Sequence, residues 1–210
     1  MKGDGYELRV CRGGACPMAA VETEGLVSRL KGLLEEARLG DFFRSLPLKS
    51  QKRYRFRVAV AACPNACPQV QIADFGLIGQ VVPRLSGDCV GCGVCEEVCE
   101  EEAVSVEDKW PLFDAERCLN CGLCIRACPK KALEPEVKGF KVLVGGKLGR
   151  HPQLAREIVA LASEEEVLRL LDRVLSYYQA HCRRGERLGT LINQTGWDEF
   201  LAHVLNRERH

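Results

Sequence analysis

Several features that point to common classes of protein are missing from this chain. Its 30 basic and 29 acidic residues leave a formal net charge of +1, whereas nucleic-acid-binding domains usually carry a clustered basic face. No apolar run approaches the roughly 18 residues of a membrane span, and we expect no signal peptide. Aromatic residues make up 6% of the chain, and low-complexity tracts are absent. We therefore expect a soluble, cytoplasmic protein with no nucleic-acid partner and no membrane span.

Cysteine, in contrast, is abundant. The chain has 4 scattered histidines but 13 cysteines, and twelve of the cysteines fall into three groups. Two groups repeat the spacing C-x2-C-x2-C-x3-C, namely Cys89, Cys92, Cys95 and Cys99, then Cys118, Cys121, Cys124 and Cys128. The third group is split into two pairs, Cys11 with Cys16 near the start and Cys63 with Cys67 in the run AACPNACPQ.

The repeated spacing is that of bacterial two-cluster ferredoxins. There, three cysteines wrap three corners of a cubane cluster, and the fourth ligand comes from the other motif. One cluster is thus predicted to use Cys89, Cys92, Cys95 and Cys128, and the other Cys118, Cys121, Cys124 and Cys99. Zinc sites more often use two well-separated C-x2-C pairs, and disulfides need an oxidising compartment. With the split group, the chain has thiolates for up to three 4Fe-4S clusters, which predicts electron transfer.

The apolar pattern predicts an α+β fold around these cysteines. Helical spacing favours a helix over residues 21–39 with Gly40 as its C-cap. Residues 53–62 and 140–144 are expected strands, and residues 70–82 hold a strand region broken at Gly76 and Gly79. Ser163 with Glu166 predicts a capping box at the start of a further helix.

The two repeated cysteine runs are predicted to form a domain of their own. Residues 87–134 are expected to be an inserted ferredoxin domain with two 4Fe-4S clusters and short strands at 104–106 and 112–113. Residues 1–86 and 135–210 then form one larger domain around the split group. The insertion has about 48 residues and so little core that we expect the clusters to stabilise it.

Four segments, in order, carry a resemblance to a known family: CRGGACPMA, VAVAACPNACPQ, DFGLIGQVVP and GFKVLVGGKLG. Together they resemble the siroheme and 4Fe-4S half of the sulfite and nitrite reductases. The inserted unit and the later stretch ERLGTLINQTGWDEF are similar to the dissimilatory and anaerobic branch. The resemblance covers nearly the whole chain and is specific.

The resemblance implies a set of cofactor ligands. The ligands of one 4Fe-4S cluster would be Cys11, Cys16, Cys63 and Cys67. The sulfur of Cys67 would bridge this cluster to the iron of siroheme, where sulfite or nitrite binds. Asn65 lies beside that position and is a candidate contact to the carboxylates of the macrocycle. Lys147 and Arg150, in the run GGKLGRHP, are candidates to pair with the same carboxylates, with ordinary surface charge as the alternative.

Two departures from the family pattern stand out. Cys11 and Cys16 are spaced C-x4-C, where the family usually has C-x5-C. Only ten residues precede Cys11, where family members normally carry an upstream half that supplies most of the cations for the substrate. No residue of this chain matches those cations, so the catalytic residues stay unknown. We expect a homodimer or a second subunit to complete the site.

Two functions are consistent with these observations. The first is a sulfite or nitrite reductase in which the ferredoxin unit feeds electrons to the 4Fe-4S and siroheme centre. The alternative is a non-catalytic iron–sulfur carrier that lacks siroheme and donates electrons to a partner enzyme. A cluster-based sensor would need an effector module, and none is visible. The remaining cysteine, Cys182, is expected to be an inert thiol, and Arg183, Arg184 and Arg187 a solvated basic patch.

Overall fold

The body of the molecule is built on a six-stranded mixed sheet. The computed structural model describes residues 2–46 and 55–205. The strands, in sheet order, are β1 (Lys2–Gly3), β2 (Tyr6–Val10), β3 (Phe56–Ala61), β4 (Phe75–Leu85), β7 (Leu133–Val144) and β8 (Arg156–Ala162). β2, β3 and β4 run parallel, and the other neighbouring pairs are antiparallel. The chain is therefore of mixed α+β class, as predicted.

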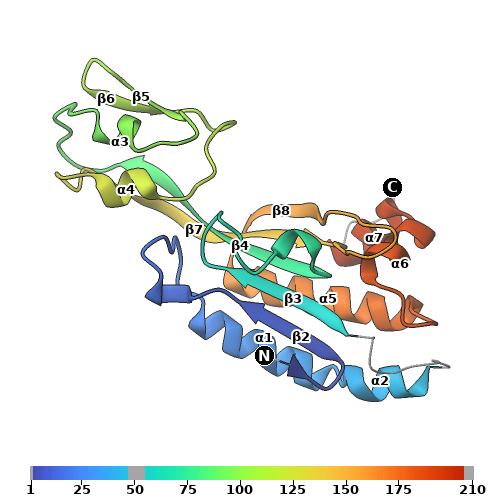
Figure 1. Ribbon diagram of the computed structural model, residues 1–210. Coiled ribbons are helices and arrows are strands. Elements are labelled where there is room, and N and C mark those ends of the chain that lie inside the picture. Colours follow the sequence, from blue (N-terminus) through green and yellow to red (C-terminus); the bar gives the residue numbers. More distant parts are fainter. Residues whose placement is uncertain (1, 47–54, 206–210) are drawn as a thin grey trace.

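Helices cover one face of this sheet. They are α1 (Glu24–Glu36), α2 (Leu39–Ser45), α5 (Glu164–His181), α6 (Leu188–Thr195) and α7 (Trp197–Val204). Figure 1 shows α1 and α5 running along the same side of the strands. The main core lies between the two layers, and it includes Val58 and Val60 of β3. At the start of α5 the Ser163 hydroxyl accepts a hydrogen bond from the Glu166 N–H, as the predicted cap requires.

Small residues line the opposite face of the sheet. Because side chains alternate along a strand, Ala59 and Ala61 of β3 point away from the helices, into a second cluster. The backbone after β3 packs closely against them and includes the short helix η3 (Val70–Ile72). A Cβ atom on Gly76 would lie 2.6 Å from the carbonyl oxygen of Val70. The breaks predicted at Gly76 and Gly79 are therefore wrong: β4 runs through both glycines, which give the covering loop room.

The first helix is shorter than predicted. α1 ends at Glu36, Arg38 takes a left-handed conformation with φ 46°, and α2 begins at Leu39. Gly40 is thus inside a helix rather than a C-cap, and the prediction was wrong. A Cβ atom there would lie 2.0 Å from the Asp4 carboxyl carbon, so the glycine permits close packing. Residues 53–54 of the predicted strand lie outside the described residues, and β8 was not predicted.

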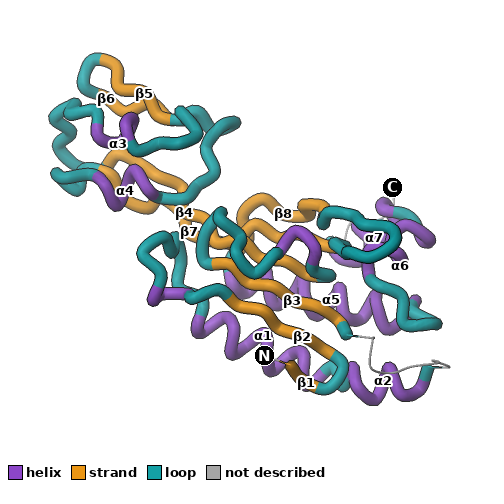
Figure 2. The backbone as a smooth tube through the Cα atoms, viewed as in Figure 1, coloured by secondary structure: helices purple, strands orange, loops and turns teal. Residues whose placement is uncertain are grey.

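A smaller unit stands away from the body at the end of a two-stranded ribbon (Figures 1 and 2). The ribbon is the far part of β4 and β7, and it ends at the pair Leu85 and Leu133. Residues 86–132, here called the cysteine-rich unit, contain α3 (Val94–Glu97), β5 (Val104–Glu107), β6 (Trp110–Phe113) and α4 (Leu123–Ala127). The two predicted short strands are thus confirmed as the hairpin β5–β6. None of the described helices is long and apolar enough to cross a membrane.

Candidate metal centres

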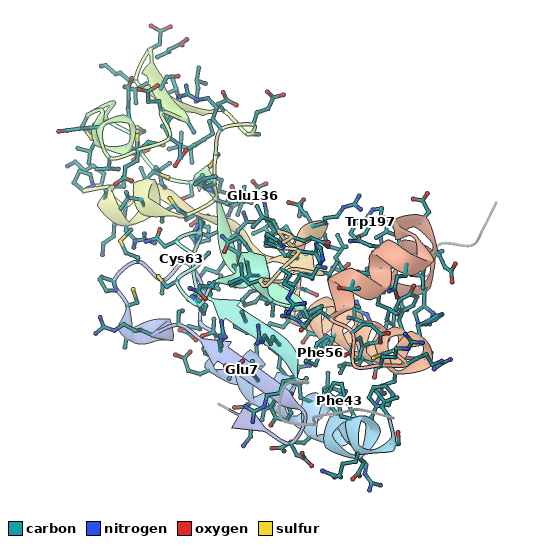
Figure 3. All side chains as sticks on the ribbon, turned by 45° about the vertical axis from the view of Figure 1, so that its right-hand side comes forward. Glu7, Phe43, Phe56, Cys63, Glu136 and Trp197 are labelled. Carbon is teal, nitrogen blue, oxygen red and sulfur yellow. The ribbon has the colours of Figure 1, made fainter. Side chains whose placement is uncertain are left out.

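Parallel pairing of β2 and β3 brings the two halves of the split cysteine group together. The last pair in the register is Val10 with Val60, so both strands end at the same edge of the sheet. Cys11 follows β2 directly, and its N–H donates to the Val60 carbonyl over 3.1 Å. Figure 3 shows Cys63 at the end of the body that faces the cysteine-rich unit.

All four cysteines of the split group line one cavity of about 330 Å³. Small side chains, including Ala19, Ala62 and Ala66, form much of the remaining wall. Cys63 is buried, Cys11 and Cys16 are half-buried, and Cys67 is exposed. Burial raises the pKa of the Cys63 thiol, and the other three cysteines raise it further. Four thiolates so close together need a cationic ligand to offset their repulsion, and binding it would release their protons.

Hydrogen bonds fix the loop between Cys11 and Cys16. This loop contains the short helix η1 (Gly13–Ala15), and the Gly13 N–H lies 3.4 Å from the sulfur of Cys11. The carboxylate of Glu24, at the start of α1, accepts from the N–H groups of Gly14 and Thr23, each over 3.0 Å. The sequence did not reveal this role, because an acidic residue in the first turn of a helix is common for its own reasons.

The cysteine-rich unit repeats one set of hydrogen bonds in its two halves. The sulfurs of Cys89 and Cys118 each accept from the N–H two residues later. The sulfurs of Cys99 and Cys128 each accept from the N–H four residues later. Burial opposes ionisation of Cys128, but N–H groups of residues 130–133 outweigh it and lower the pKa of its thiol. Donors aimed at sulfur stabilise the negative charge of a thiolate.

The predicted set made of Cys118, Cys121 and Cys124 with Cys99 from the other motif lines a second cavity of about 120 Å³. Burial raises the pKa of Cys118, and it raises that of Cys124 to about 12. In the other predicted set, burial raises the pKa of the Cys95 thiol, and the nearby Cys89 and Cys92 raise it further. Cys128 packs in the same small core as Cys95. Within the described residues, no group of three or more His, Cys, Asp or Glu could hold a single metal ion as placed.

The two cavities share part of their walls. Met18, Pro64 and Asn65, from the loops that carry the split group, also line the second cavity. Asn65 lines both cavities. The residue expected beside siroheme therefore stands between the two sets of sulfur atoms.

The glycine-rich run after β7 is held by α6. Lys147 is half-buried, and its ammonium donates to the Thr190 hydroxyl over 2.9 Å. Arg150 is exposed. Neither residue lines the first cavity as far as the described residues define it, and their contact with a macrocycle stays a prediction.

A buried ion pair joins this run to the sheet. Arg187 donates from Nε to both carboxylate oxygens of Asp74, over 2.9 and 3.0 Å, and from Nη2 to the Gly146 carbonyl over 2.9 Å. Asp74 is 1% exposed. Arg187 was expected in a solvated basic patch, and that expectation was wrong. The remaining cysteine, Cys182, is buried with its sulfur 3.4 Å from a Glu186 carboxylate oxygen.

Residues 9–210 match the family described as the nitrite and sulphite reductase 4Fe-4S domain. This chain belongs to that family. An iron–sulfur cluster is therefore its type of cofactor, as the cysteine pattern predicted.

Relatives of known name support this assignment. The chain is 36% identical over 195 residues to the coenzyme F420-dependent sulfite reductase of Methanocaldococcus jannaschii, which covers 90% of this chain and 30% of that protein. It is 25% identical over 200 residues to the assimilatory-type sulfite reductase of Nitratidesulfovibrio vulgaris, covering 94% of this chain and 83% of that one. The chain thus spans less than a third of the Methanocaldococcus protein.

A solved structure shares the fold. The crystal structure of dissimilatory sulfite reductase I superposes with a TM-score of 0.67 at 18% identity, over 97% of this chain and 52% of that one. The chain therefore shares its overall fold with part of that protein.

Proposed function

We propose that the chain passes electrons through the cysteine-rich unit to a 4Fe-4S and siroheme centre at which sulfite or nitrite is reduced. The observation that carries this proposal is the shared wall between the two cavities. Pro64 and Asn65, next to the split group, line the same space as Cys118 and Cys121. A redox centre in one cavity would lie beside a centre in the other.

The proximity of the two cavities suggests the order in which the clusters would pass electrons. The cluster held by Cys99, Cys118, Cys121 and Cys124 would lie nearest to the body. The cluster held by Cys89, Cys92, Cys95 and Cys128 would receive electrons first, from a donor outside the chain. The split group would hold the third cluster, because its four sulfurs surround one cavity. Twelve thiolates then serve three cubane clusters, with four to each.

The exposure of Cys67 supports a siroheme at the third centre. Cys67 is the exposed residue among the four cysteines around the first cavity. A second metal can therefore reach its sulfur from outside. When bound, siroheme would supply an iron with an open position for the oxyanion. Lys147 and Arg150 are our candidates to pair with its carboxylates, and Asn65 is a further candidate. Lys147 would have to share its ammonium with Thr190.

No residue of the chain has been assigned as a cation that would bind the substrate. A developing anion is stabilised by pre-positioned positive charge. A partner subunit or a second copy of the chain would supply it. The Nitratidesulfovibrio relative supports activity in a protein of similar length, because the match covers 83% of a chain that is named a sulfite reductase.

A non-catalytic carrier is the second candidate. It is favoured by the exposed position of Arg150 and by the engagement of Lys147 with Thr190, since neither cation lines the first cavity. In this function the three clusters pass electrons to a partner enzyme without siroheme.

Cofactor content separates the two candidates. The protein is purified without oxygen, its iron and extracted siroheme are quantified, and sulfite and nitrite reduction is assayed with reduced methyl viologen as donor. About thirteen irons per chain, twelve in clusters and one in siroheme, together with reduction of either anion, support the reductase. About twelve irons without siroheme and without activity overturn it and leave the carrier.

A further inference from the structure

The ribbon alone is a weak support for the cysteine-rich unit. It consists of two strands, and its register shifts between Val82 and Pro83. Two-stranded ribbons are only marginally stable, and an irregularity in the register bends them. A unit attached only in this way would vary in its distance from the body. Electron transfer between the two cavities requires a fixed short distance.

A second attachment grips the cysteine loop itself. The side chain of Gln80 donates from Nε2 to the carbonyl of Leu119 over 3.2 Å. The N–H of the next residue, Val81, donates to the carbonyl of Asn120 over 2.7 Å. Leu119 and Asn120 are the two residues between Cys118 and Cys121, so both bonds hold the backbone between two predicted ligands.

Arg126 provides a third connection. Its Nη1 lies 3.1 Å from the carbonyl oxygen of Cys121 and 3.4 Å from that of Ala19. Ala19 lines the first cavity, and Cys121 lines the second. One guanidinium group therefore connects a predicted ligand of one centre to the wall of the other.

The burial of Gln80 shows that this contact is specific. Its side chain is 5% exposed, and it interrupts the otherwise apolar strand segment FGLIGQVV. Burying an amide is costly unless it is hydrogen-bonded, and a strand of the body needs no polar residue there for its own packing. The acceptor for this amide, the Leu119 carbonyl, lies in the cysteine-rich unit, on the other side of the register shift.

We propose that Gln80 and Arg126 are positioning residues that fix the nearer cluster of the cysteine-rich unit against the centre at Cys11, Cys16, Cys63 and Cys67. They set the rate of electron transfer between these two centres without contacting substrate. The inference rests on the proposed function for its purpose, but the geometry it predicts can be tested without any substrate.

The test compares two variants with two matched controls in the fully loaded protein. Gln80→Met removes the amide at nearly constant size, and Arg126→Gln removes the exposed guanidinium. The first control is Gln179→Met, because Gln179 donates from the same kind of amide to the Ala37 carbonyl over 2.8 Å, away from the cysteine-rich unit. The second is Arg117→Gln, because Arg117 pairs with Glu102 inside the unit.

Three readouts follow the position of the unit. Hydrogen exchange of the Val81 N–H should become about fivefold faster in Gln80→Met, the equivalent of one lost hydrogen bond of about 1 kcal/mol. Magnetic coupling between the reduced clusters should weaken in both variants, and electron equilibration after rapid partial reduction should slow. Iron content and cluster potentials should match those of the controls.

Two outcomes would overturn the inference. The first is unchanged magnetic coupling and unchanged equilibration in both variants. The second is a loss of iron or a shift in potential that the controls do not share, which would assign these residues a structural role. Arg126 is exposed, so Arg126→Gln tests the proposal even where Gln80→Met folds poorly. A protein without siroheme or activity would contradict the proposed function, while the coupling measurement would still decide this inference.

Discussion

The backbone N–H of Ala62 donates a hydrogen bond to the sulfur of Cys11 over 3.2 Å, across 51 positions of sequence. This contact exists because β2 and β3 are parallel neighbours, so the first cavity is assembled by the sheet. The cysteine-rich unit has a much smaller core. Four buried residues form it, of which two are cysteines and one, Leu133, belongs to β7. The two parts of the chain should therefore depend on metal to different degrees.

Removal of iron should unfold the cysteine-rich unit and leave the body folded. A unit with so little apolar core draws its stability from metal binding, whereas the body buries a large core between sheet and helices. The measurement is hydrogen exchange before and after chelation under reducing conditions. Amides of β5 and β6 should lose protection, and amides of β3 and α5 should keep it. Retained protection in β5 and β6 would show that the unit folds without clusters.

Replacement of one predicted ligand should remove one cluster. Cys118→Ala should lower the iron content by about four atoms per chain, because the sulfur belongs to a single four-thiolate set. Cys182→Ala is the matched control, since Cys182 is buried beside Glu186 and outside all three sets. Iron analysis of protein purified without oxygen gives the result. An equal loss in the two variants would contradict the assignment of ligands.

Local patterns predicted some of the secondary structure well. The hairpin β5–β6 and the cap at Ser163 depend on neighbouring residues, so the sequence reveals them. Gly76 and Gly79 were predicted to break the strand, but β4 runs through both. The absence of a side chain at Gly76 leaves room for the backbone of Val70. Strand β8 was not predicted, although its sequence REIVALA contains an apolar run; in the structure Ala162 is the residue of this strand that is buried.

The spacing of the cysteines led to the predicted ligand sets, which stay predictions, but it said nothing about their supports. The structure places Cys99 in one cavity with Cys118, Cys121 and Cys124, the set to which it was assigned. The contacts of Glu24 and Gln80 join positions 10 and 39 residues apart, and no local pattern reports them. Gln80 left one trace, a polar residue in an apolar strand.

Loss of the Glu24 carboxylate should weaken the centre at Cys11 and Cys16. Glu24→Ala frees the N–H groups of Gly14 and Thr23, so the loop between the two cysteines loses its contact with α1. Iron should be lost faster to a chelator, while hydrogen exchange in the cysteine-rich unit stays the same. Glu24→Gln retains one acceptor oxygen, so its rate of iron loss should lie between those of the unaltered protein and Glu24→Ala. Glu22→Ala, at an exposed position nearby, serves as the control. Equal rates of iron loss in Glu24→Ala and Glu22→Ala would remove the role assigned to Glu24.

Disruption of the buried ion pair should destabilise the body. Asp74→Asn leaves the Arg187 guanidinium without its counter-charge, and the new amide group cannot accept from all of the donors around Asp74, which include the Arg57 and Leu188 N–H groups. Breaking a buried pair in this way costs about 3 kcal/mol of the free energy of unfolding. Urea titration without oxygen measures the loss, with the exposed Asp172→Asn as control.

A double variant separates the charge from the packing. Asp74→Leu with Arg187→Met replaces the pair by apolar side chains, and such replacements are often close to neutral. It should therefore be more stable than Asp74→Asn if the uncompensated charge is the main cost. Arg187 also donates to the Gly146 carbonyl, which only the double variant loses. Siroheme or iron loss confined to the double variant would show that the pair holds the glycine-rich run in place. A double variant as unstable as the single one would instead mean that the hydrogen bonds of Arg187 matter more than its charge.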